Sequence, residues 1–282
     1  MPTPLCTRRT SPLPPGPRRD HQWYNASMVT AQDLLQVFDR DERRSAEFPG
    51  LRREELPGLV RHVDLIGHSG MVIYSHLSAD SVDATIREQI EYFRSIGQEF
   101  EWKVYRHDEP PDLLDRLAAH AFAIDETEAV LVLDLHENLP SLQSEAPVRR
   151  VGSLDELREV ASIKERVYGA GADDLLRHLS FEMDQAPDYL SVYVAYIDDV
   201  PAATAWIRFP QHSAFASLWG GSTLPEVRNR GLYTSLLAAR IEEARQRGYR
   251  YVTVDARHMS RPILEKRGFR LLTYTTACTR NG

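Results

Sequence analysis

The sequence predicts a mixed α/β fold in which a mostly antiparallel sheet is flanked by helices. Runs rich in β-branched and aromatic residues alternate with segments whose apolar residues recur every three or four positions. Neighbouring β-rich runs are joined by short turns, as in residues 59–66, the turn GHSG and residues 71–77. The second half of the chain repeats the element order of the first, with additions at its start, so we expect two related units in tandem.

The composition is that of an ordinary globular protein. Of its 282 residues, 42% are hydrophobic and 27% are charged, and the longest apolar runs are far shorter than a bilayer span. A formal net charge of -7 disfavours a general nucleic-acid binder, which needs a wide basic face. Its charge and its short apolar runs thus predict neither a nucleic-acid nor a membrane partner. Two cysteines, Cys6 and Cys278, supply neither a disulfide framework nor a clustered metal site, so we expect a cytoplasmic protein without a metal.

Within residues 1–28, the first 20 or so are rich in Pro and Arg, poor in acid and without an apolar stretch long enough for a signal peptide. We expect a disordered tail, with Met28 as an alternative natural start. A targeting segment is the other reading, but the prolines oppose the amphipathic helix of a transit peptide. Order is expected to begin at Thr30, which forms a capping box with Asp33.

The first unit is expected over residues 29–140, as a degenerate copy of the second. After the hairpin, apolar residues recur at helical spacing through 81–97, and Gly97 supplies a C-terminal stop. The other predicted elements are a strand at 101–106, a helix at 111–122 and a strand at 129–135. The polar, proline-containing stretch 136–147 is the predicted boundary.

The second unit is expected over residues 147–282. It opens with a helix at 153–169, for which Ser153 and Glu156 suggest a capping box. The later predicted elements are a hairpin of strands 189–197 and 201–209, a strand at 214–221, a helix at 232–248, a strand at 251–256, a short helix at 260–268 capped by Ser260, and a strand at 269–276.

The two units differ in charge where a strand leads into a helix. The second unit has VRNRGLY at 227–233, whereas the first has HLSADSVDA at 76–84. A helix N-terminus attracts anions through its unpaired amides and its dipole. Arg228 and Arg230 strengthen that attraction, whereas Asp80 and Asp83 oppose it. A basic turn is more often a solvated surface, so the charges by themselves leave both interpretations open.

The surrounding pattern resembles the GNAT superfamily of acyl-CoA-dependent N-acyltransferases over residues 147–277. The family's loop reads Arg or Gln, two residues, Gly, one residue, then Gly or Ala, and Arg228 and Gly231 match it. Tyr233 stands where the family has a small residue. The resemblance implies that backbone amides of this loop bind the pyrophosphate of acetyl-CoA and that the preceding strand end binds its pantetheine arm. The implied cofactor residues are Gly221, Ser222, Thr223, Arg228, Asn229, Arg230, Gly231, Leu232, Tyr233 and Thr234.

The sequence indicates the catalytic groups less clearly than the cofactor residues. Transfer from a thioester to an amine needs a neutral amine, a donor to the carbonyl oxygen and an acid for the thiolate. The family's acid is often a tyrosine four residues before the Gly of a closing GF, which is Leu264 here, and leucine cannot donate a proton. His258 is the remaining catalytic candidate, near Asp255, and an exposed loop histidine is the alternative. Trp219 either lines the acceptor site or belongs to the core.

The resemblance favours an acetyl-CoA-dependent N-acetyltransferase that acts on a primary amine of unknown identity, in a small molecule or a peptide. The first unit then shapes or covers the acceptor site. A non-catalytic acyl-CoA-binding regulatory protein is the alternative, favoured by Leu264. A structural interaction module without a ligand is a third interpretation, and the oligomeric state is left open.

Overall fold

A computed structural model describes residues 30–138, 142, 146–169 and 172–280. The predicted tail of residues 1–28, with Cys6 and the alternative start at Met28, lies outside the described residues, as does half of the predicted boundary segment.

The N-terminal half begins with helix α1 (Ala31–Phe38) and the predicted capping box. The Thr30 hydroxyl accepts a hydrogen bond from the Asp33 amide, and the Asp33 carboxylate accepts one from the Thr30 amide, each at 3.1 Å. The chain then passes directly into a π-helical turn, η1 (Asp39–Arg44). The elements that follow are β1 (Leu51–Leu56), β2 (Leu59–Asp64), β3 (Ser69–Ser75), α2 (Val82–Ser95), β4 (Glu99–Tyr105), α3 (Leu113–Ala119), β5 (Ala123–Ile124) and β6 (Glu128–Asp134).

The C-terminal half repeats this order with two helices at its start. Its elements are β7 (Val148–Arg150), α4 (Leu157–Tyr168), α5 (Ala172–Gln185), β8 (Leu190–Ile197), β9 (Val200–Arg208), β10 (Phe215–Thr223), η2 (Pro225–Val227), α6 (Leu232–Gln246), β11 (Tyr251–Ala256), α7 (Arg261–Glu265) and β12 (Arg270–Arg280).

The strands form one 12-stranded sheet in the order β1-β2-β3-β4-β12-β6-β11-β10-β9-β8-β7, with β5 beside β12. Only two neighbouring pairs among these described strands are parallel, β3 with β4 and β10 with β11. The predicted mixed α/β fold with a mostly antiparallel sheet is therefore confirmed.

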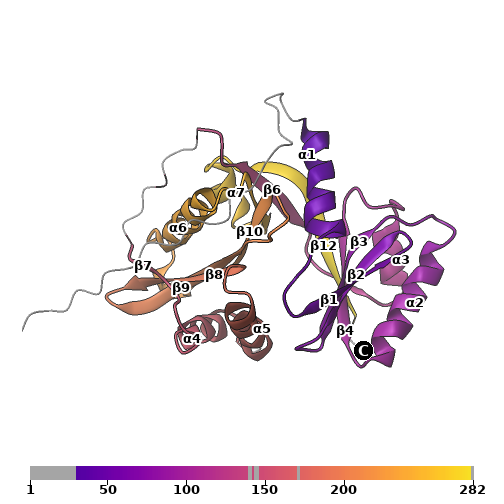
Figure 1. Cartoon of the computed structure of the whole chain (residues 1–282), viewed down its shortest axis with the longest axis horizontal. Coiled ribbons are helices and arrows are strands. Elements are labelled where there is room, and N and C mark those ends of the chain that lie inside the picture. Colours follow the sequence, from indigo (N-terminus) through magenta and orange to yellow (C-terminus); the bar gives the residue numbers. More distant parts are fainter. Residues whose placement is uncertain (1–29, 139–141, 143–145, 170–171, 281–282) are drawn as a thin grey trace, which may run out of the picture.

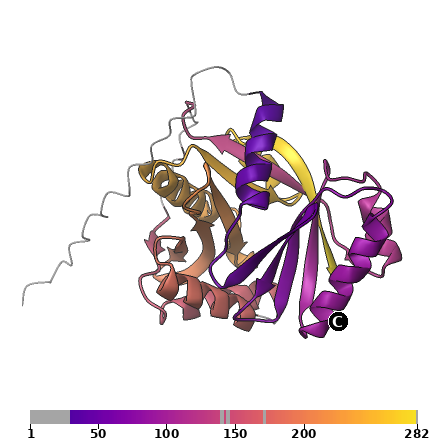
Figure 2. The same ribbon diagram turned by 45° about the vertical axis from the view of Figure 1, so that its right-hand side comes forward.

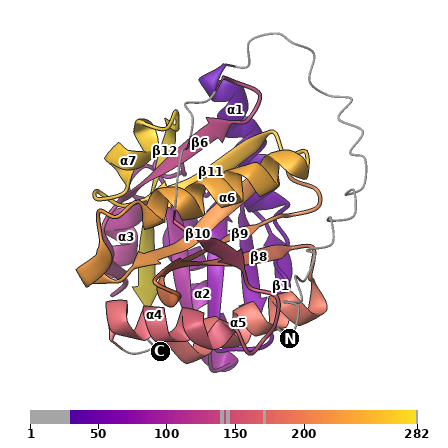
Figure 3. The same ribbon diagram turned by 90° about the vertical axis from the view of Figure 1, so that its left-hand side faces the viewer.

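The two halves exchange their last strands. β6, from the N-terminal half, lies between β11 and β12 (Figures 1 and 3). The second part of β12 reaches in the other direction and pairs with β4 on one side and with β5 on the other. Each half thus completes the sheet of its partner, and the backbone hydrogen bonds of the exchange join them into one body.

Helices cover both faces of this sheet. α6 and α7 pack on one face of the C-terminal half through a core that includes Leu131, Leu218 and Leu264, whereas α4 and α5 cover the other face of β8 and β9 (Figure 1). α1 stands where the halves meet (Figure 2) and buries Phe38 against Phe215 and Tyr251. The N-terminal half therefore contributes residues beside β10 and β11 of its partner.

Six elements were not predicted, and two capping predictions were wrong in part. β1, η1, β5, β7, α5 and η2 are absent from the sequence-based expectations. α4 begins only at Leu157, because the Glu156 carboxylate accepts from the Gly152 amide at 2.7 Å while the Ser153 hydroxyl is a distant acceptor, 3.4 Å from the Glu156 amide. Ser260 does occupy the N-cap of α7, but its hydroxyl donates to the Arg257 carbonyl at 3.2 Å and caps no amide.

Candidate functional site

The N-terminus of α6 presents amide groups beside a basic loop. Gly231 is the N-cap, and no side chain caps the first turn. The amides of that turn, in residues 232–234, have no intrahelical acceptor and lie at the positive end of the helix dipole. Arg228 and Arg230 are exposed and have no carboxylate partner within the described ranges. These groups together suit a bound anion.

The loop reaches the helix through two left-handed residues. Asn229 has a φ of 61° and Gly231 a φ of 80°, which Asn and Gly adopt more readily than other residues. A Cβ added at Gly231 would meet no atom within 4 Å. Backbone conformation, rather than crowding inside the protein, therefore favours glycine, and the space outside it is open.

Tyr233 turns toward the strands. A Cβ built on Gly221 would lie 3.4 Å from the Tyr233 ring, which is partly buried against the core under α6. Burial raises the pKa of this phenol. The large side chain thus contacts β10, while its amide stays in the first turn of the helix.

The parallel strands β10 and β11 diverge beside this loop. Phe215, Ala216 and Ser217 pair with residues 251–253, and no pair joins the strands beyond them. β10 also shifts register against β9 between Trp219 and Ser222, at a bulge where Gly220 has a φ of 65°. A Cβ on Gly220 would lie 1.9 Å from the Trp206 ring, so only glycine permits this contact. The predicted pantetheine residues Gly221, Ser222 and Thr223 follow directly.

A buried arginine contacts the bulge. Arg240 of α6 is 2% exposed, and its Nη1 lies 3.3 Å from the Trp206 carbonyl and 3.5 Å from the Trp219 carbonyl. No carboxylate pairs with it among the described residues, and burial lowers its pKa to about 10. Even so, the guanidinium is charged at neutral pH, so the bulge carries positive charge.

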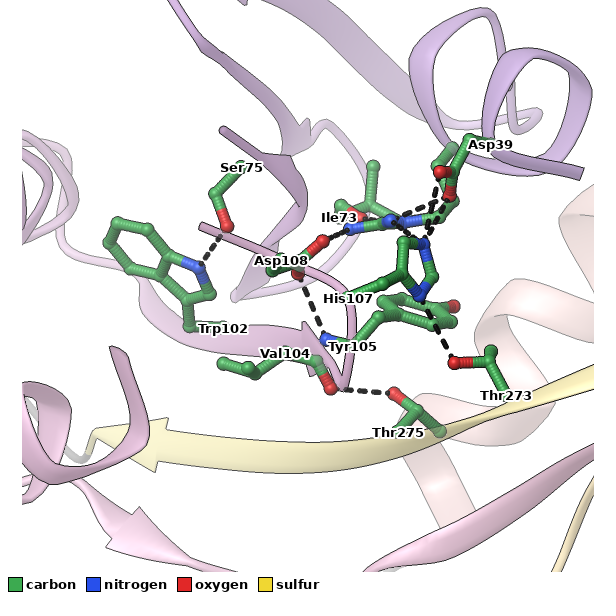
Figure 4. Close-up of polar contacts among 11 residues, drawn as sticks. Asp39, Ile73, Ser75, Trp102, Val104, Tyr105, His107, Asp108, Thr273 and Thr275 are labelled. Atoms are coloured by element: carbon green, nitrogen blue, oxygen red, sulfur yellow. Dashed lines mark hydrogen bonds and ion pairs between the residues drawn. The ribbon is translucent and has the colours of Figure 1, made fainter. Parts of the chain in front are cut away.

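In the N-terminal half, an ionic cluster lies where the corresponding strands, β3 and β4, separate (Figure 4). β3 and β4 pair through Val72 and Trp102 and then separate. The buried Arg43 donates from Nε to the Ile73 carbonyl at 3.1 Å and from Nη2 to the Asp108 carboxylate at 2.6 Å. Asp108 in turn accepts from the Tyr105 amide at 2.9 Å. The Ile73 carbonyl and the Tyr105 amide, where β3 and β4 diverge, thus have hydrogen-bond partners within the protein.

The start of α2 also differs from that of α6. Asp83 lies in its first turn and pairs with Arg116 at 2.5 Å and with His120 at 3.1 Å. The hydrogen bond from His120, together with Arg116 of α3, holds the pKa of Asp83 below its ordinary value. This carboxylate adds negative charge to the first turn of α2.

Residues of both halves meet on the face that carries Trp219. Lys103 of β4 pairs with Asp255 of β11 at 2.5 Å, and its ammonium lies 5.5 Å from the Trp219 ring. Trp219 is 36% exposed, and its indole nitrogen donates to the Ser217 hydroxyl at 2.8 Å. Although desolvation opposes the charge, Asp255 raises the pKa of Lys103. Trp219 therefore lies on an open polar face rather than in the core.

Glu42 of η1 is a titratable group on this face that sequence reasoning missed. Its carboxyl accepts from the Ser213 hydroxyl at 2.5 Å, just before β10. Burial raises its pKa to about 7, with Asp41 and Asp255 acting in the same direction. Such a carboxyl exchanges protons near neutral pH. Its only signal in the sequence is the acidic run at the end of α1, which does not reveal its partner.

The two positions considered for catalysis differ in burial. His258 is exposed after β11, with its Nδ1 3.1 Å from Glu126. Leu264 is fully buried in the core under α7 and supplies no proton.

A cavity of about 370 Å³ lies elsewhere, between β4, α3 and β12, lined by Val104, Arg106, Pro110, Leu113, Tyr274 and Thr276 among others. Most of its lining comes from the N-terminal half, with Tyr274 and Thr276 added by β12, and no residue of the basic loop lines it. Within the described residues no cluster of metal-ligating side chains occurs, and none of the helices has the length and apolar character to cross a membrane.

Comparison with known proteins agrees with the C-terminal geometry. Residues 156–269 match the model of the Acetyltransferase (GNAT) family. No curated protein matches the chain.

Solved structures share the whole fold. A GCN5-related N-acetyltransferase from Kribbella flavida is 16% identical with a TM-score of 0.59, and the alignment covers 89% of this chain and 95% of that one. A tandem GNAT protein from the clavulanic acid biosynthesis pathway is 14% identical with a TM-score of 0.56, and the alignment covers 83% of this chain and 84% of that one. Residues 156–269 of this chain therefore form a domain of the GNAT acetyltransferase family.

Proposed function

We propose that the protein is an acetyl-CoA-dependent N-acetyltransferase that transfers the acetyl group to a primary amine of a small molecule or peptide. The cofactor lies along the C-terminal half, with its pyrophosphate on the amides of residues 228–234 and its pantetheine arm on residues 221–223. The observation that carries this proposal is the uncapped N-terminus of α6 beside the diverging strands β10 and β11 and beside Arg228 and Arg230, which have no carboxylate partner in the part of the chain that the structure describes.

The N-terminal half is a degenerate relative that binds no cofactor and forms one wall of the acceptor site. Lys103 and Glu42 support this role, because both reach the face that carries Trp219. Glu42, with a pKa near 7, is a candidate proton acceptor for the ammonium of the substrate. His258 stays a second candidate at the C-terminal end of β11.

Calorimetry with acetyl-CoA tests the cofactor site. The double substitution Arg230→Glu and Gly231→Glu places two carboxylates at the helix N-terminus, and we expect it to abolish acetyl-CoA binding without unfolding the protein. The matched change Asp80→Ala with Asp83→Ala in the N-terminal half should leave the affinity unchanged. Unchanged affinity in the first variant would remove the site assignment.

A non-catalytic acyl-CoA-binding regulatory role is the second candidate, because Leu264 is buried at the position of the family's tyrosine. Thiol release from acetyl-CoA across a panel of amines, aminoglycosides, polyamines and peptides separates the two. An enzyme releases thiol with at least one amine, whereas a regulator binds acetyl-CoA and releases none above background.

A further inference from the structure

Lysine is rare in this protein. Only three of its 34 basic residues are lysines, namely Lys103, Lys164 and Lys266. Arginine stays charged in proteins, whereas a lysine can lose its proton and become a nucleophile. The surroundings of each lysine therefore decide which of them can react with a thioester.

Lys164 has no acidic partner within the described ranges. It projects from α4 and is partly buried, with its ammonium 4.9 Å from the Trp206 ring and 5.0 Å from the Tyr168 ring. Burial is the one cause that lowers its pKa, to about 8. About a tenth of these amines are then neutral at pH 7. Lys103, by contrast, is paired with Asp255, which keeps it charged.

Lys164 also lies next to the bulge of β10. The Trp206 ring beneath its ammonium is the ring that Gly220 approaches so closely that a Cβ there would overlap it. At the other side of the diverging strands, Arg257 has a raised pKa, caused first by its hydrogen bond to Glu128 and further by the nearby Tyr168. Tyr168, at the end of α4, thus lies near Arg257, which directly follows β11.

We propose that Lys164 is an internal acyl acceptor, which takes the acetyl group from acetyl-CoA bound along β10. The inference rests on the proposed function, because it needs the cofactor on the C-terminal half. The neutral nitrogen of Lys164 attacks the thioester carbonyl, so that a C–N bond forms and the C–S bond breaks. Sulfur leaves with the electron pair, and the proton lost by nitrogen reaches it through solvent, giving acetyl-lysine and the free thiol of CoA.

The test uses the intact protein and acetyl-CoA, without any other amine. After incubation between pH 6 and 9, peptide mass spectrometry measures the 42 Da acetyl increment at each of the three lysines. We expect Lys164 to be acetylated about tenfold faster than Lys103 or Lys266, at a rate that rises to about pH 8 and then levels off. Tyr168 is a titratable group beside this amine, with its ring 5.0 Å from the ammonium.

Three variants complete the test. Lys164→Arg keeps the charge and should lose the fast acetylation, whereas Lys266→Arg should keep it. Arg230→Glu with Gly231→Glu should slow acetylation of Lys164 to the rate of Lys266, because the reaction depends on bound cofactor. In the same variant acetic anhydride should still acetylate Lys164, since that reagent needs no cofactor site.

The outcomes separate this inference from the proposed function. If calorimetry shows that the protein binds acetyl-CoA but Lys164 is acetylated no faster than Lys266, the inference is overturned and the cofactor site stands. If the protein binds no acetyl-CoA, the proposed function fails and the inference fails with it.

Discussion

In both halves of the sheet a parallel strand pair diverges beside a helix N-terminus: β3 and β4 next to α2, and β10 and β11 next to α6. In the N-terminal half, Arg43 and Asp108 satisfy the separating backbones, and Asp83 supplies negative charge to the start of α2. In the C-terminal half, the start of α6 is uncapped and flanked by positive charge. The same backbone arrangement can therefore be closed by its own side chains or left open for an anion.

The largest expected effect concerns the cluster that fills the N-terminal strands. Arg43→Met leaves the buried Asp108 carboxylate without its cation, and we expect a loss of about 3–5 kcal/mol in the free energy of unfolding. Urea denaturation measures it. The exposed pair of Arg94 and Glu91 provides the control, since Arg94→Met should cost less than about 1 kcal/mol. A loss for Arg43→Met as small as this control would show that the cluster does not stabilise the half.

A second comparison uses two glycines with nearly the same φ, Gly220 and Gly97. Gly220→Ala in the C-terminal bulge adds overlap with Trp206 to the strain of a positive φ, so we expect a loss of about 2–4 kcal/mol together with weaker acetyl-CoA binding. Gly97→Ala, at a φ of 66° with no atom near its Cβ, should cost only about 1 kcal/mol. Thermal unfolding and calorimetry measure both variants. Equal losses of stability in the two variants would mean that the contact with Trp206 does not restrict position 220 to glycine.

The smallest of these effects is pH-dependent and concerns Glu42, which the N-terminal half places beside β10. Its pKa is about 7 in the folded protein and 4.5 when unperturbed, so the unfolded chain releases this proton first as the pH rises. The Glu42 contribution to stability should therefore fall by about 1–3 kcal/mol between pH 4.5 and pH 7 and stay constant above it. Glu42→Gln should lose this dependence in urea denaturation across that range. Parallel pH profiles of the two proteins would contradict it.

Local chemistry made part of this fold predictable. The capping box at Thr30 and the hairpin of β2 and β3 depend on neighbouring residues, so short sequence patterns were sufficient. The helix at 153–169 was placed less well, because Glu156 hydrogen-bonds to Gly152 and α4 begins four residues late. α5 was missed altogether, although its buried Leu179 packs in the same core as α4.

The sequence by itself determined the loop VRNRGLY before α6 and the acidic start of α2, because charge and glycine are fixed by residue identity. Only the tertiary structure decided which groups share a site. Lys103 and Asp255 are 152 residues apart and meet at 2.5 Å, and Glu42 reaches Ser213 across 171 residues. These contacts follow from the exchange of β6 and β12, and a strand carries no local signal of the half in which it finds its hydrogen-bond partners.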